Sequence, residues 1–214
     1  MIGGGGHARV VIEAAQLSRI SWEVIGYVDN RPVLAPNAPP QVPYLGTDDD
    51  LAALLDVAGR EAPAVVLAVG RGDRRRIVER LDRLGVTWAT VIHGAAWHSP
   101  SAAIGRDAVI MAGVVVQAGA RIGDHVILNT GAIIEHDVTI GDYVSIGPGA
   151  RIGGRTVIGL DVLIGLGASI RDGCHVGDRA IIGMGAAVVG DVAADTMVLG
   201  VPARVASADG DRRP

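Results

Sequence analysis

The sequence contains no lysine, no phenylalanine and a single cysteine. Without lysine the chain cannot form a Schiff base with a carbonyl compound, and it has no phosphate-loop lysine. The one cysteine, Cys174, excludes a disulfide within the chain and a cysteine-rich zinc site, and it fits a reducing compartment. Aromatic residues make up 3% of the chain and hydrophobic residues 49%. We therefore expect a narrow core of Val, Ile, Leu, Ala and Gly.

The sequence also lacks an excess of positive charge and a long apolar run. A formal net charge of −4 leaves no basic face for a nucleic-acid backbone. The longest stretch without a charged residue, 84–105, is interrupted by Thr87, His93 and Pro100, and no signal-like segment precedes the first domain. We therefore expect a cytoplasmic protein that binds neither nucleic acid nor a membrane.

An aliphatic residue recurs at every sixth position in the second half of the chain. A fixed period of this kind is the signature of a stacked repeat architecture. The fifteen positions are Ile104, Ile110, Val116, Ile122, Leu128, Ile134, Ile140, Ile146, Ile152, Ile158, Ile164, Ile170, Val176, Ile182 and Val188. Three hexads make one triangular coil of eighteen residues, so the run predicts about five coils in a domain spanning residues 99–205.

Two further registers accompany the aliphatic one. A small or β-branched residue stands four places after each aliphatic, and Cys174 in this register is expected to be a packed thiol. Glycine directly follows nine of the fifteen aliphatics, where we expect a corner whose backbone conformation disfavours side chains. Asn129 directly follows Leu128, at a position where glycine is usual in the other hexads. It either tolerates a left-handed corner or contacts the substrate.

Residues 1–98 lack the six-residue period and alternate short apolar runs with amphipathic segments. We predict strands at 1–2, 22–28, 64–69 and 88–92, helices at 8–18, 47–58 and 73–84, and a proline-rich connection over 32–43. Thr47 is the expected cap of the second helix, with Asp50 in the capping-box position. This alternation predicts a small parallel sheet of Rossmann type. The polar residues 206–214 are predicted to form a mobile tail.

The chain begins with a glycine-rich motif. Residues 3–8, GGGGHA, satisfy G-x-G-x-x-A ahead of a predicted helix, and Asp29 follows at the end of a predicted strand. Such glycines let the backbone approach a pyrophosphate, and a carboxylate at that place accepts hydrogen bonds from a ribose or base. Nucleotide binding is the favoured interpretation, and a tight structural turn is the alternative. Because only one βαβ half is present, a nucleoside diphosphate with an attached group fits better than a dinucleotide.

Several segments together resemble one family. They are the GGGGHA start, YVDN at 27–30, the hexads, NTGAIIEHD at 129–137 and the closing GVPAR at 200–204. Over nearly its whole length the chain is similar to the NeuD/PglD-like bacterial sugar acetyltransferases. That family is similar to sialic acid O-acetyltransferase and includes N-acetyltransferases of UDP-, dTDP- or GDP-linked 4-amino-4,6-dideoxysugars. The resemblance implies a left-handed parallel β-helix, a hand that the period alone does not give.

The resemblance implies transfer of an acetyl group from acetyl-CoA to the amino group of such a nucleotide-linked sugar. It assigns His136 as the general base and Asp137 as the acid that polarises it. A near-neutral imidazole suits removal of the proton from the attacking amine. Adjacent side chains point apart in an extended strand, but these two residues come just after Ile134, near a corner where they can meet. Glu135 is the alternative orienting acid, and a solvated corner histidine is the alternative to a catalytic one.

The same resemblance assigns the binding residues and the assembly. Nucleotide binding falls to Gly5, Gly6, His7, Asp29 and Asn30, and the CoA arm lies along the backbone near Ser145, Leu166 and Met184. Some members carry a second histidine where this chain has Ser145, so electrophilic assistance would come from a backbone N–H. The family is trimeric with its active site between neighbouring β-helices, so we expect a homotrimer.

Two other functions are compatible with the same fold. A zinc hydro-lyase would need three histidines converging between adjacent coils, but His136 has Ala118 and Gly154 one coil away on either side, so no metal site is expected. A sugar O-acetyltransferase of the sialic acid type would leave the nucleotide-binding half unused. Four other histidines have no recognisable partner in the sequence and are interpreted as structural or solvated: His93, His98, His125 and His175.

Overall fold

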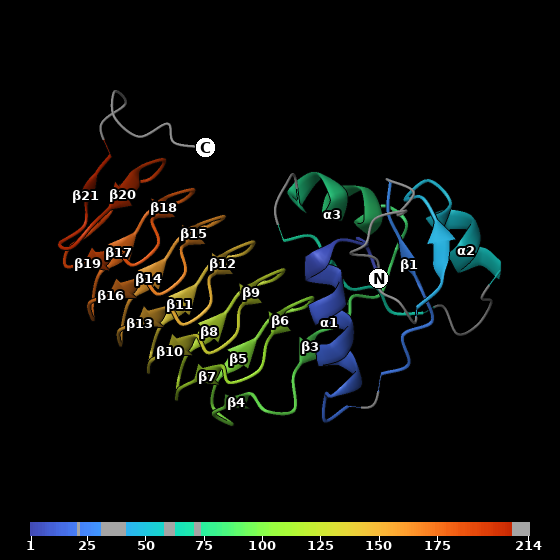
Figure 1. Cartoon of the computed structure of the whole chain (residues 1–214), viewed down its shortest axis with the longest axis horizontal. Helices are drawn as coiled ribbons and strands as arrows, with labels where there is room; N and C mark the ends of the chain where they lie inside the picture. Colours follow the sequence, from blue (N-terminus) through green and yellow to red (C-terminus); the bar gives the residue numbers. More distant parts are fainter. Residues whose placement is uncertain (21, 31–41, 58–62, 71–73, 207–214) are drawn as a thin grey trace. The chain divides into compact units, whose positions relative to one another are not determined.

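The chain divides into two compact units, Met1–Gly94 and Ala95–Pro214, whose elements are labelled in Figure 1. The computed structural model describes residues 1–20, 22–30, 42–57, 63–70 and 74–206. Most of the predicted proline-rich connection and the predicted tail beyond Ala206 lie outside these ranges. No helix within them is long and apolar enough to cross a membrane.

The described residues of the N-terminal unit form short strands and three helices. Its elements are α1 (Gly6–Gln16), β1 (Tyr27–Val28), β2 (Tyr44–Gly46), α2 (Leu51–Val57), α3 (Arg74–Asp82) and β3 (Val91–Ile92). The predicted helices are present with slightly different ends, whereas the predicted strands shrink to two residues or to single bridges. β2 is missing from the prediction because its three residues form too short a run to show an alternating pattern. The helix predicted over 47–58 begins at Leu51, and Asp50 accepts from the N–H and the hydroxyl of Thr47.

A parallel sheet organises this unit. Ile2 forms parallel bridges to Val28 on one side and Leu67 on the other, β2 pairs with β1, and Val65 bridges Trp88. The order across the sheet is therefore β2, β1, Ile2, the 65–67 segment and Trp88. Along the chain, β1 and β2 are added on one side of Ile2, and the 65–67 segment and Trp88 are added on the other side. In open parallel sheets, ligands bind outside the carboxyl ends of the strands where the strand order reverses in this way. Both the glycine-rich motif and Asp29 follow strands at that edge.

The second unit is a stack of two-residue and three-residue strands. They are β4 (Trp97–His98), β5 (Ala103–Ile104), β6 (Val109–Ile110), β7 (Val115–Val116), β8 (Arg121–Ile122), β9 (Ile127–Leu128), β10 (Ile133–Ile134), β11 (Thr139–Ile140), β12 (Ser145–Ile146), β13 (Arg151–Ile152), β14 (Val157–Ile158), β15 (Leu163–Ile164), β16 (Ser169–Ile170), β17 (His175–Val176), β18 (Ile181–Ile182), β19 (Ala187–Val188), β20 (Met197–Leu199) and β21 (Arg204–Val205). From β4 to β19 the paired residues are eighteen positions apart, as Ile134 is from Val116 and Ile152. The last coil is shorter, since Ile181 of β18 pairs with Met197 of β20.

Three parallel sheets result, one on each face of the coil. One contains β4, β7, β10, β13, β16 and β19, a second contains β5, β8, β11, β14 and β17, and a third contains β6, β9, β12, β15 and β18 with β20 and β21 at its end. Among the described residues of this unit, only the β20–β21 pair is antiparallel. The predicted fold class, an α/β unit followed by a parallel β-helix of hexapeptide repeats, is confirmed.

Two inward registers build the core of the coils. The predicted aliphatics from Ile110 to Val188 are all buried, and so is the small-residue register four places later, including Cys174. Burial raises the pKa of the Cys174 thiol, which suits a packed side chain. The stack begins earlier than predicted, because β4 already pairs with β7. Its residues, Trp97 and His98, are not aliphatic, so the hexad pattern does not reveal them.

The expected role of the glycines at the corners is wrong. Left-handed backbone falls on the third residue after the inward aliphatic, not the first, and residues with side chains often adopt it: Asp107, His125, Asp137, Tyr143, Arg155, Asp161, Arg179 and Asp195. The glycine directly after the aliphatic is required by close approach instead. A Cβ on Gly123 would lie 2.5 Å from Asp142 Oδ1 and 2.8 Å from the carbonyl carbon of Gly141. Asn129 is likewise not left-handed, since Gly131 takes that place with φ 67°.

Candidate active site

The corner between β10 and β11 brings two titratable side chains together. Asp137 has φ 58°, so its side chain turns back toward its neighbour, and His136 Nδ1 lies 2.9 Å from Asp137 Oδ2. A carboxylate only accepts hydrogen bonds, so Nδ1 carries the hydrogen and Nε2 of the neutral ring is left as the acceptor. Both side chains reach solvent, with 49% and 64% exposed. Nε2 can therefore receive a proton from a bound molecule.

Glu135, the alternative orienting acid, is not engaged with the imidazole. Its backbone N–H donates to Ile152 O on the next coil, and its half-buried side chain makes no hydrogen bond or ion pair to His136 within the described residues. The geometry therefore pairs His136 with Asp137.

A second histidine–carboxylate pair lies elsewhere in the coils. His125 Nδ1 is 2.7 Å from Asp107 Oδ2, and the His125 ring stacks on Tyr143 with centroids 5.0 Å apart. His125 therefore has a partner that the sequence prediction did not identify, and its burial fits the structural alternative given for it. The signal was its spacing of eighteen residues from Asp107, which is one coil. The side chains of this pair are only 1% and 0% exposed, so His136 is the accessible member of the two.

The residues expected along the CoA arm lie on a different part of the coil. Leu166 and Met184 occupy the corners that follow β15 and β18, one coil apart, and are 55% and 78% exposed. Ser145 is the outward residue of β12, which lies in the same sheet as β15 and β18, one coil before β15. His136 follows β10 at another corner. We call the exposed residues Leu166 and Met184 the Leu166–Met184 column. Within one chain, His136 and this column lie at different corners of the coil.

The glycine-rich motif leaves the start of α1 open. Gly5 is the N-cap residue and provides no side-chain cap, and a Cβ on Gly5 or Gly6 would meet no atom of the described residues within 4 Å. The first-turn N–H groups of a helix lack intrahelical partners and favour an anion. Gly4 N donates to Asp29 Oδ2 at 2.7 Å, so the predicted acid also fixes the shape of the loop.

His7 lies in the first turn of the same helix. Burial, and then the positive charge of Arg74, lower its pKa to about 4. The ring is therefore neutral at physiological pH and carries a single N–H. Its Cγ would lie 3.4 Å from a Cβ on Gly70, so the ring packs beside the segment that follows the 65–67 strand.

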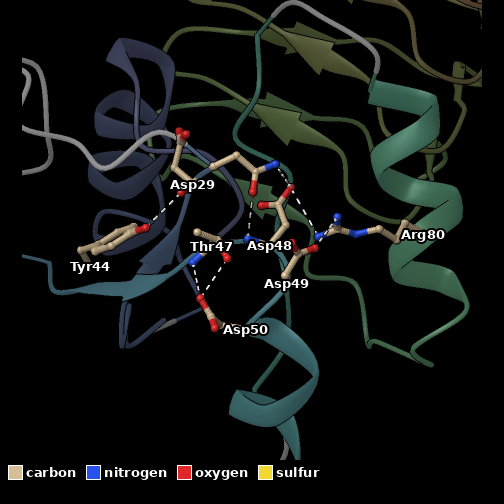
Figure 2. Close-up of polar contacts among 8 residues, drawn as sticks. Asp29, Tyr44, Thr47, Asp48, Asp49, Asp50 and Arg80 are labelled. Carbon is tan, nitrogen blue, oxygen red and sulfur yellow. Dashed lines mark hydrogen bonds and ion pairs between the residues drawn. The ribbon is translucent and has the colours of Figure 1, made fainter.

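Asn30 follows β1 and belongs to a polar network with Asp48 and Arg80. Figure 2 labels Asp48 and Arg80. Asn30 Nδ2 donates to Asp48 Oδ2 at 2.8 Å, and Asn30 Oδ1 accepts from Asp48 N at 3.2 Å. Arg80 Nη2 lies 3.6 Å from the same Asp48 oxygen. Burial raises the pKa of the Asp48 carboxyl, although Arg80 and the hydrogen bond from Asn30 act in the opposite direction. Two contacts thus fix the orientation of the Asn30 amide.

This network borders a cavity of about 470 Å³. The lining residues are Asn30, Asp48, Arg76, Ile77, Arg80 and Arg83. Sequence reasoning missed the three arginines. The available signal was their spacing of four and then three residues, which places them along one side of α3 and its continuation. A cavity of this size and charge suits a small anionic ligand.

Within the described residues, no three or more His, Cys, Asp and Glu side chains are grouped so that they could hold a metal ion.

Comparisons with known proteins agree with this architecture. A family model for the PglD N-terminal domain matches residues 1–81, and a model for the bacterial transferase hexapeptide (six repeats) matches 101–135 and 119–154. A comparison with curated protein sequences gives no significant match.

Solved structures of high similarity are available. A mutant of perosamine N-acetyltransferase from Caulobacter crescentus, in complex with CoA and GDP-perosamine, is 33% identical, with 96% of this chain and 95% of that chain covered and a TM-score of 0.87. The acetyltransferase domain of PglB from Neisseria gonorrhoeae is 37% identical, with 96% and 97% covered and a TM-score of 0.87. The same domain is known in complex with acetyl coenzyme A.

The fold and the hexapeptide match define an enzyme of the acetyltransferase class. Both units and the identities place it further: the chain belongs to the PglD-like family of hexapeptide acetyltransferases.

Proposed function

We propose that this protein transfers an acetyl group from acetyl-CoA to the amino group of a nucleotide-linked 4-amino-4,6-dideoxysugar. The observation that carries the proposal is the exposed His136–Asp137 pair, 2.9 Å apart on a corner of the coils. Relatives that cover nearly the whole chain support it, since one is named for acetylation of perosamine and is bound to CoA and GDP-perosamine.

In the proposed reaction the neutral amine attacks the thioester carbonyl. As the nitrogen–carbon bond forms, the amine proton passes to Nε2 of His136, and the Asp137 carboxylate stabilises the imidazolium. The tetrahedral adduct then expels the CoA thiolate, which takes the proton from the His136 imidazolium, so the products are an amide and free CoA and the imidazole is neutral again. Ser145 stands where some family members have a histidine that contacts the thioester carbonyl. In this chain a backbone N–H would donate the hydrogen bond that stabilises the developing negative charge on the carbonyl oxygen.

The N-terminal unit would hold the nucleotide part of the substrate. The open start of α1 at Gly5 and Gly6 offers N–H groups to the phosphates, with His7 as a neutral neighbour. Asp29 and Asn30 stand at the end of β1, where they can meet the ribose or base. The arginine-lined cavity next to Asn30 adds positive charge for an anionic ligand.

We further propose a homotrimer whose sites are shared between chains. The support is that His136 and the Leu166–Met184 column lie at different corners, so a CoA arm along that column would meet the His136 of a neighbouring chain. Light scattering should give three times the 21.9 kDa chain mass. In mixed trimers of His136→Ala and Leu166→Asp chains, roughly a quarter of head-to-tail sites would regain both partners and activity. A monomer, or no recovery on mixing, would contradict the shared site.

The experiment that tests the proposed function is thiol release from acetyl-CoA with a panel of UDP-, dTDP- and GDP-linked 4-amino sugars. We expect turnover with one nucleotide series and a product that survives hydroxylamine, because an amide is not cleaved under conditions that cleave an ester. Turnover with free sialic acid alone, giving a hydroxylamine-sensitive ester, would support the O-acetyltransferase instead.

A further inference from the structure

The imidazole of His136 lies directly over the backbone of the next coil at Gly154. A Cβ added to Gly154 would stand 2.7 Å from His136 Nε2, 2.9 Å from Cε1 and 3.2 Å from Cδ2. Distances below 3.0 Å do not occur between real Cβ atoms and their neighbours, so the ring would have to move. The three nearest atoms all belong to His136. A side chain at position 154 would therefore first collide with the imidazole of His136.

Backbone conformation does not explain the glycine. Gly154 lacks the positive φ found at glycines such as Gly131 and Gly149, so a side chain would cost no left-handed strain there. Positions 118, 136, 154 and 172 occupy the same corner of successive coils. Ala118 and Asp172 stand there on the coils before His136 and after Gly154, so this corner accepts side chains on other coils. At position 154 the side chain of His136 occupies the space that a Cβ would need.

Asp137 has a similar arrangement on the preceding coil. A Cβ on Gly119 would lie 2.5 Å from Asp137 Oδ1, the oxygen that is not bonded to His136. The histidine–aspartate pair thus lies between two glycines from neighbouring coils. Gly119 has φ 72°, so a substitution there would also strain the backbone, and Gly154 is the cleaner position to test.

We infer that Gly154 is a positioning residue that sets where Nε2 of His136 stands. The inference rests on the proposed function and adds a residue that acts only through His136. With alanine at position 154, the ring must turn away from its place over the coil, and Nε2 loses its alignment with the substrate amine. A displacement of about 1 Å at a reacting group can lower the rate by about 10²-fold.

The test is a double-mutant cycle on the full-length protein. Gly154→Ala should lower kcat by about 10²-fold with little change in either KM. Gly190→Ala is the matched control, because position 190 is the same corner two coils further on and a Cβ there would meet no atom of the described residues within 4 Å. That variant should behave as the wild type. In a His136→Ala background, Gly154→Ala should cause no additional loss.

The outcomes separate the inference from the proposed function. If His136→Ala lowers kcat but Gly154→Ala does not, or if Gly154→Ala lowers kcat equally in both backgrounds, the positioning role is wrong while the general base stands. If His136→Ala itself leaves kcat unchanged, the proposed mechanism fails first. A Gly154→Ala protein that has lost its coils by circular dichroism would also overturn the inference, because the residue would then be needed for folding.

Discussion

Asp137 accepts a hydrogen bond from its immediate neighbour, His136, at 2.9 Å between Oδ2 and Nδ1. Adjacent residues of a strand point to opposite faces, so this contact depends on the left-handed backbone at Asp137. Asp and Asn tolerate that conformation better than most residues. The corner therefore fixes both the partner of the imidazole and its tautomer.

Replacing Asp137 by Asn should lower kcat by roughly 10²-fold, less than the ~10⁴-fold seen for a buried triad aspartate, because this carboxylate is exposed. Asn keeps the shape and tolerates the left-handed corner, so stability should stay near that of the wild type. Steady-state kinetics of Asp137→Asn beside Glu135→Gln makes the comparison. A larger effect from Glu135→Gln would show that the other acid orients the histidine.

Asp29→Ala should raise the KM for the nucleotide sugar and leave that for acetyl-CoA unchanged. Loss of a charged hydrogen-bond partner is worth about 1.5–3 kcal/mol, and each 1.4 kcal/mol is about tenfold in affinity. Because Asp29 also accepts from Gly4 N, Asp29→Asn serves as the control that keeps an acceptor for the loop. Equal changes in both KM values would show that the nucleotide does not bind at this edge of the sheet.

Stability should fall in acid through His7. Its pKa is lowered to about 4 in the folded chain from 6.5, so the unfolded chain takes up the proton first. Full stability is therefore present above pH 6.5 and is lost as the pH falls toward 4. The loss between pH 7 and pH 5 is on the order of 2 kcal/mol from this group. Urea unfolding at both pH values should show a smaller difference in His7→Gln than in the wild type, and identical differences would exclude His7 as the source.

The coils could be predicted from the sequence because both inward registers repeat without a gap, as Ile134 and Val138 illustrate. The corner geometry could not, since left-handed residues such as Asp137 and Arg155 share no residue type. The sheet of the N-terminal unit was only partly predictable, because bridges at single residues such as Ile2 give no alternation. The Asn30–Asp48 contact joins two strand ends through the sheet order, which the local pattern does not contain.

Replacement of His136 by Ala tests the central claim most directly. The side chain is half exposed at a corner, so its removal leaves no core cavity and the protein should stay folded and assembled. With a nucleotide-linked 4-amino sugar and acetyl-CoA, kcat should fall by roughly 10²–10⁴-fold while both KM values stay near those of the wild type. An unchanged kcat in a folded variant of the same oligomeric state would contradict the account, because His136 would then be only a corner residue.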